Sequence, residues 1–265
     1  MFEIFEYDFM QRAFLAGLII AILASVSGTF VVLRRYSMIS ETLAHSALVG
    51  VAVGLVAGFN PLWMAVIVAI CSAWLIEYLR SAFSLYSDAI MAILLSGSLA
   101  VAVVIVSLGG AFNNSLFSYL FGSILSVSVE DIYTIAFFGT ISLVLLLSFS
   151  KELYFVAYDE EVAQTNGIQV RFLNFLLVTV VAIIIALSIR VVGSLLIGAL
   201  MVIPTIAALQ FRVGFLPTVL ISLVFAIFSV IFGMTLSFYF SLPSGATIVL
   251  SVLGVFIISL IVSKK

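Results

Sequence analysis

The chain has 265 residues, of which 65% are hydrophobic and only 8% are charged, and its mean hydropathy is +1.42. Because soluble globular domains carry about 25% charged residues, this composition excludes a soluble protein and indicates a polytopic membrane protein. The net charge is −2 and the chain has no long basic tract, which argues against nucleic-acid binding. The single cysteine, Cys71, has no partner for a disulfide within the chain, and we expect it to pack among apolar side chains.

Charged residues separate the apolar segments, so membrane spans are predicted by reading between the charges. We expect spans near residues 13–33, 38–59, 61–79, 89–110, 131–149, 172–189, 191–211, 214–238 and 245–262. The span at 191–211 contains Gly193, Gly198 and Pro204, a composition typical of a broken or re-entrant helix. The sequence therefore predicts an all-α integral membrane protein with eight to nine spans, and residues 1–265 form one transmembrane domain.

With nine crossings, the connections between spans alternate between the two sides of the membrane. The positive charges are unequally divided between these two sides. One face holds Arg34, Arg35, Arg80, Lys151, Arg171, Arg212, Lys264 and Lys265, and the other holds Arg12 and Arg190. By the positive-inside rule the richer face is cytoplasmic. We therefore expect the N-terminus outside and the C-terminus in the cytoplasm.

Glu41 and the only histidine, His45, lie within an otherwise apolar segment. Four residues apart, they share one face of a helix, within reach of a single ligand. Ionisable groups inside a bilayer usually face a pathway or a partner. A carboxylate with an imidazole suits manganese, ferrous iron or zinc. The alternative is that Glu41 caps the helix and His45 fills the core. Two donors are too few for tight binding, so we expect a transient metal site completed by a second copy or by other groups.

A stripe of glycines, Gly50, Gly54 and Gly58, follows His45 on the same predicted helix. Small residues at this spacing let another helix approach closely. The stripe lies about 160° around the helix from Glu41 and His45. One face is therefore predicted to pack against protein while the other lines a path.

The connection between residues 151 and 171 is the only substantial polar segment. Within it Asp159 is expected to cap a short helix with Glu160 and Glu161 in its first turn, and Gly167 is expected to end that helix. The helix is too short to be stable alone, which favours a role as a lever held by a cytoplasmic partner. The alternative is a solvated connector between two spans. The chain contains no motif for ATP hydrolysis or other catalysis, so energy must come from a partner or a gradient.

Four stretches, in this order, resemble the permease family of manganese, zinc and iron ABC importers. They are SETLAHSALVGVA at 40–52, DEEVA at 159–163 with Gly167 and Ile168, GSLLIGAL at 193–200 with Pro204, and PSGATIV at 243–249. The resemblance implies a type II importer permease in a bacterial plasma (inner) membrane, which acts as a homodimer. It also implies separate ATP-binding cassette subunits and an extracytoplasmic metal-binding protein. The segment Asp159–Gly167 then resembles the helix that couples a permease to its ATPase.

The sequence departs from this family at Glu41, where an aspartate is common, and at Ser241, where many members carry an acidic residue. These departures leave the number of metal ligands and the identity of the metal open. We expect no enzyme activity and no stably bound cofactor, with the metal ion as cargo and membrane lipid around the chain. The alternative function is a stand-alone, gradient-driven divalent-cation carrier or channel, and an intramembrane enzyme is a more distant one. A carrier should show further intramembrane charges as relays, and we predict none beyond Glu41 and His45.

Overall fold

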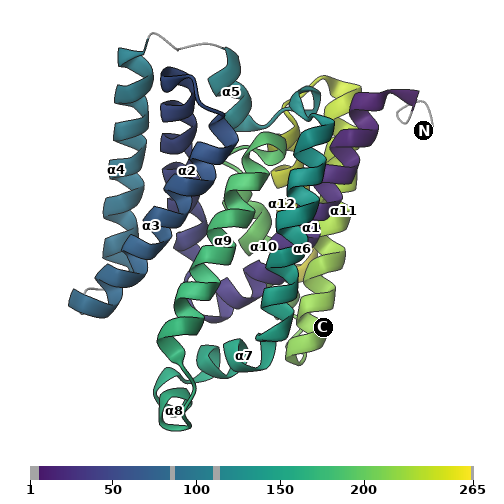
Figure 1. The fold of residues 1–265 in the computed structure, drawn as a ribbon. Coiled ribbons are helices and arrows are strands. Elements are labelled where there is room, and N and C mark those ends of the chain that lie inside the picture. The colour runs from purple at the N-terminus through teal and green to yellow at the C-terminus, as the bar shows by residue number, and fades with distance from the viewer. Residues whose placement is uncertain (1–5, 84–86, 110–113, 264–265) are drawn as a thin grey trace.

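The computed structural model describes residues 6–83, 87–109 and 114–263, and the secondary structure in these ranges is entirely helical (Figure 1). Eight helices are long and apolar enough to cross a membrane. These are α1 (Asp8–Leu33), α2 (Ser37–Ala57), α3 (Pro61–Phe83), α4 (Ser87–Leu108), α6 (Val129–Ser148), α9 (Val170–Val192), α11 (Phe215–Phe240) and α12 (Ser244–Ser263). The shorter elements are α5 (Asn114–Phe121), the 3-10 turn η2 (Ile124–Ser126), α7 (Ser150–Tyr158), α8 (Glu160–Thr165) and α10 (Ile197–Leu209).

The chain breaks between α9 and α10, as the glycines predicted. Gly193 has a φ of +92°, and a Cβ at this position would lie 2.6 Å from the carbonyl carbon of Phe121, so glycine is required. At the far end of α10, the Phe215 ring lies 4.7 Å from the ring of Tyr154 in α7. The short, buried α10 therefore runs from the α5 end of the bundle to the α7 end. The prediction of eight to nine spans is confirmed, with the break at 193–196 inside the segment expected to form one span.

The start of α1 and the end of α12 lie at opposite ends of the bundle (Figure 1). The Tyr7 ring, just before α1, is 5.8 Å from the ring of Phe238 near the end of α11. Because α12 begins directly after α11, its first residue is also at this end. Its last residue, Ser263, is separated from that first residue by a helix of membrane length and therefore lies at the opposite end.

The glycine stripe of α2 packs closely against α3 over part of its length. A Cβ on Gly50 would lie 2.6 Å from the Cα of Ala65, and one on Gly54 would lie 2.7 Å from the Cα of Pro61. Backbones approach this closely only where side chains are absent. Gly58 was wrongly assigned to the packing stripe. It ends α2 in the left-handed conformation, with a φ of +75°, and a Cβ there would touch nothing within 4 Å.

The centre of the bundle consists of α1, α2, α9 and α10, whose side chains are mostly buried. Helices α3, α4, α6, α11 and α12 surround them and expose large apolar side chains, among them Ile93, Val104, Phe137 and Leu220. Such an apolar exterior suits lipid contact. Cys71 is exposed on α3, which differs from the expectation that it packs among apolar side chains of the chain.

Candidate functional site

The predicted pair of ionisable residues is adjacent near the beginning of α2. The Oε1 atom of Glu41 is 3.5 Å from Nε2 of His45, as their helical spacing requires. The imidazole is buried, with 6% of its side chain exposed, whereas the carboxylate is 36% exposed. His45 is therefore enclosed by protein, and Glu41 is the accessible member of the pair.

The first turn of α10 lies directly against the Glu41 carboxylate. A Cβ added to Gly198 would be 2.7 Å from Oε2 of Glu41 and 3.4 Å from Oγ of Ser40. Glycine at this position makes room for the carboxylate, which also lies beside the end of α10 whose dipole favours negative charge. Sequence reasoning noted Gly198 only as a helix breaker and missed this contact. The one sequence signal that pointed to a role for Gly198 is its place in the GSLLIGAL stretch at 193–200.

The pair supplies a carboxylate oxygen and an imidazole nitrogen as donors for a metal ion. Among the described residues, the buried Nδ1 of His45 has no hydrogen-bond partner. A buried polar atom without a partner is uncommon, and an imidazole in this state can still bind a cation or water. Across the described ranges, no group of three or more His, Cys, Asp or Glu side chains is placed to hold a metal ion. The described residues of one chain therefore bring two such donors together at this place.

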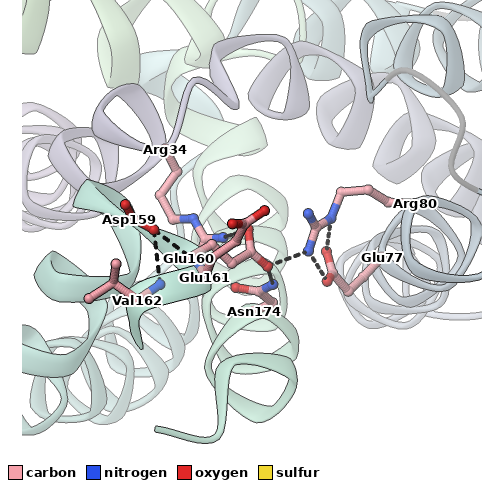
Figure 2. Close-up of polar contacts among 8 residues, drawn as sticks. All are labelled: Arg34, Glu77, Arg80, Asp159, Glu160, Glu161, Val162 and Asn174. Atoms are coloured by element: carbon pink, nitrogen blue, oxygen red, sulfur yellow. Dashed lines mark hydrogen bonds and ion pairs between the residues drawn. The ribbon is translucent and has the colours of Figure 1, made fainter. Parts of the chain in front are cut away.

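The start of α8 agrees with the sequence prediction. The Oδ1 atom of Asp159 accepts hydrogen bonds from the backbone N–H groups of Glu161 and Val162, each at 3.0 Å (Figure 2). Glu160 and Glu161 occupy the first turn, where negative charge is favourable. Asp159 is therefore the N-cap.

The end of α8 also agrees with its prediction, because Gly167 is left-handed with a φ of +82°. Its N–H donates to the carbonyl of Gln164 at 3.1 Å, and the N–H of Ile168 donates to the carbonyl of Ala163 at 3.2 Å. This pair of bonds is a Schellman motif, which satisfies carbonyls that the helix leaves free. The polar segment thus forms a helix with both ends capped.

Glu160 points into the bundle, where it meets residues of α3 and α9 and Arg34, the residue after α1 (Figure 2). Its Oε2 accepts from Nη2 of Arg34 at 3.0 Å, and its Oε1 accepts from Nδ2 of Asn174 at 3.1 Å and lies 3.5 Å from Nη2 of Arg80. Arg34 also donates from Nη1 to Oδ1 of Asn174. These contacts belong to the Glu160 cluster, which consists of Arg34, Tyr36, Glu77, Arg80, Glu160 and Asn174. The sequence did not reveal it, because its members are far apart along the chain.

Arg80 and Glu77 form a two-point ion pair inside the Glu160 cluster. The guanidinium donates from Nη2 to Oε1 at 2.7 Å and from Nε to Oε2 at 3.1 Å. Only 2% of the Glu77 side chain is exposed. A buried carboxylate requires such a partner, so these two charges are matched within α3.

Tyr36 lies between the two arginines of the cluster. The guanidinium carbons of Arg34 and Arg80 are 5.3 and 5.5 Å from the centre of its ring, within the range of cation–π attraction. Burial raises the pKa of Tyr36 to about 12, although Arg80 and Arg34 act to lower it. The phenol is therefore neutral, and its ring contributes through its π face.

A second cluster of polar side chains lies at the opposite end of the bundle. Asp131 and Ser128 form a capping box at the start of α6, and Arg190 of α9 donates from Nη1 to Oδ2 of Asp131. Ser241, where the family often has an acidic residue, ends α11 at this same end with a φ of +52°. It is not brought together with Glu41, which is one turn into α2 from the other end.

An all-α bundle whose described residues include eight long apolar helices, with an ionisable pair inside one of them, defines a multi-pass membrane protein. The chain belongs to the ABC 3 transport family, whose family model matches residues 6–263. This confirms the resemblance seen in the sequence. The chain is thus a membrane permease of an ABC transporter and is not an enzyme.

Individual relatives match over nearly the whole chain. A probable metal transport system membrane protein of Treponema pallidum is 36% identical over 248 residues, covering 93% of each chain. The high-affinity zinc uptake system membrane protein ZnuB of Haemophilus influenzae is 30% identical, covering 96% of this chain and 97% of its own. Manganese permeases of Streptococcus and Listeria also match.

A solved structure, PsaBC from Streptococcus pneumoniae in complex with Fab, shares the fold. It aligns with a TM-score of 0.85 at 27% identity, covering 96% of this chain and 91% of the compared chain. The similarity therefore extends over the arrangement of the helices as well as over the sequence.

Proposed function

We propose that the chain is the permease subunit of an ATP-driven importer of divalent transition-metal ions, namely manganese, zinc or iron. The observation that carries this proposal is the adjacent carboxylate and imidazole of Glu41 and His45 within a membrane-spanning helix. These donors suit all three ions, and ionisable groups inside a membrane usually serve transport. The names of the matching relatives support the same class of cargo.

Two copies of the chain form the translocation path in this proposal. Within the described part of the chain, one copy supplies the two donors of Glu41 and His45, and a two-fold axis would place a second pair opposite the first. The metal ion is cargo, so a weak site from which it can leave suits its passage. The partial exposure of Glu41 supports the idea that the carboxylate meets the ion first.

The two ends of the bundle serve different partners. The capped α8 docks on an ATP-binding cassette subunit in the cytoplasm, while an extracytoplasmic metal-binding protein delivers the ion at the end formed by α5 and η2. The membrane is a bacterial plasma membrane, with the N-terminus outside and the C-terminus in the cytoplasm. The excess of arginine and lysine at the α8 end supports this orientation.

The test is uptake of radioactive manganese or zinc by cells that produce the whole complex. His45→Ala should abolish uptake at normal membrane levels, because it removes a metal ligand. Glu41→Asp is the matched control, which should remain active because it keeps the carboxylate. Full uptake by His45→Ala would show that the histidine is structural and would remove the metal site from this position.

The same assay separates an ATP-driven importer from a gradient-driven carrier. Cells that lack the ATP-binding subunit should take up no metal through the permease. Uptake that persists without that subunit and collapses with the proton or sodium gradient would identify a carrier instead.

A further inference from the structure

The two glutamates in the first turn of α8 face different surroundings. Glu160 points toward the bundle and contacts side chains of α3, α9 and the end of α1 (Figure 2). Glu161 is exposed, and its backbone N–H donates to Oδ1 of Asp159. Glu161 is thus open to a partner that approaches from outside, whereas the Glu160 side chain, although 41% exposed, is bonded to the bundle.

Glu160 supplies a charge that its neighbours need. Arg34 has only 3% of its side chain exposed, and the negative charge of Glu77 is already bonded at two points by Arg80. With Glu160 in place, the cluster contains two positive and two negative groups. If α8 moved away alone, the guanidinium of Arg34 would lose its carboxylate partner while still buried, which is strongly unfavourable. Displacement of α8 should therefore carry the ends of α1, α3 and α9 with it.

The cluster also reaches the helix that carries the candidate metal ligands. Arg34 follows the last residue of α1, and Tyr36 directly precedes α2. The corner between them is fixed by hydrogen bonds from the N–H of Arg34 to the carbonyl of Phe30 at 3.0 Å and from the N–H of Tyr36 to the carbonyl of Val31 at 2.9 Å. Along α2, Glu41 is about 7.5 Å from Tyr36 at the helical rise. A displacement of Arg34 would therefore be transmitted to a point close to the Glu41 carboxylate.

We propose that Glu160 is the positioning residue that ties α8 to the metal-bearing helix α2 through Arg34, Arg80 and Tyr36. When α8 moves, the Glu160 cluster and the start of α2 then move with it, and this displaces Glu41 and His45. This inference rests on the proposed function, in which α8 docks on the ATPase. It divides the predicted coupling residues between two tasks, with Glu160 facing the bundle and Glu161 facing the partner.

The test measures metal transport and ATP hydrolysis together in vesicles that contain the permease and its ATP-binding subunit. Glu160→Ala should lower the amount of metal moved per ATP by about tenfold, within the usual range of coupling between sites. Glu130→Ala is the matched change, because Glu130 is an exposed glutamate in the first turn of α6 at the opposite end of the bundle. It should leave the ratio within about twofold of the unchanged complex. A merely structural loss would lower both rates in proportion and leave the ratio unchanged.

A second variant decides the outcome if Glu160→Ala fails to assemble. Glu160→Gln removes the charge but keeps the size and an oxygen for Asn174. A reduced ratio in Glu160→Gln supports the positioning role, and an unchanged ratio overturns it. Failure of the underlying function looks different, because the unchanged complex would then hydrolyse ATP and move no metal at all.

Discussion

The carboxylate of Glu41 is confined between His45 on its own helix and Gly198 on another. The imidazole is 3.5 Å from one carboxylate oxygen, and the space on the other side exists only because Gly198 lacks a side chain. The position of the carboxylate is therefore set by two helices that meet only in the folded chain.

Gly198→Ala should weaken metal uptake without preventing folding. Its Cβ would come within 2.7 Å of a carboxylate oxygen, which belongs to a side chain that can swing away. Loss of one metal contact should reduce affinity about tenfold, equivalent to about 1.4 kcal/mol. Gly254→Ala in α12 is the control, because a Cβ there has no atom within 4 Å. Equal uptake by the two variants would contradict the role given to Gly198.

Tyr36→Phe should be tolerated, whereas Tyr36→Leu should not. Among the described residues the buried hydroxyl has no hydrogen-bond partner, so its removal costs little. Leucine would abolish the attraction of the ring for Arg34 and Arg80, which is about 0.5–2 kcal/mol for such pairs. Thermal unfolding in detergent should show a lower midpoint for Tyr36→Leu alone. Similar loss in both variants would point to the hydroxyl instead.

At the scale of elements, α8 has only six residues and depends on its two caps and on Glu160 for its shape. Its N-terminal cap, its Schellman end and its inward carboxylate all lie within ten residues of sequence. A helix held in this way can transmit force as a rigid piece.

Gly167→Val should impair coupling while leaving membrane insertion intact. The φ of +82° is strained for a β-branched residue by about 1–2 kcal/mol, although a Cβ there meets no neighbour. Gly167→Asn is the control, since asparagine accepts this conformation more readily. The measurement is metal transported per ATP in vesicles. Normal coupling and normal association with the ATPase in Gly167→Val would argue against α8 as the lever.

The short α10 shows how an interrupted crossing is stabilised. Its thirteen residues span about 20 Å, less than the roughly 30 Å of a hydrocarbon core. The non-helical backbone before it is satisfied by α5, because Ser194 and Leu195 donate to the carbonyls of Tyr119 and Leu120. Irregular backbone at membrane depth is tolerated only when protein satisfies it in this way.

At the scale of the whole molecule, the described residues form eight helices long enough to cross a membrane, and α10, counted as a ninth crossing, would make the number odd. Single cysteines at Glu6 and Ser263, in a Cys71→Ser background, should therefore react with a membrane-impermeant maleimide from opposite sides. The expected outer residue is Glu6, because the positive-inside rule assigns the arginine-rich end to the cytoplasm. Labelling of both from the same side would require an even number of crossings, with α10 returning to the side from which it entered.

The sequence by itself determined the membrane class, the approximate spans, the adjacency of Glu41 and His45, and both ends of α8. Each of these depends on residues within a few positions of one another. Hydropathy reports the length of an apolar segment, helical spacing reports which residues share a face, and capping depends on three or four neighbouring residues. The family resemblance likewise depends on neighbouring residues, because it is carried by four short stretches of the chain.

Only the tertiary structure decided that Gly198 adjoins Glu41, that Glu160 joins Arg34 and Arg80, and that Gly58 ends a helix instead of packing. These facts depend on which helix meets which. An apolar helix in a membrane has no hydrophobic face to distinguish its neighbours, because lipid tails are as apolar as protein side chains. Close packing at glycines and pairing of buried charges select the partners, and both become visible only when the helices are in place.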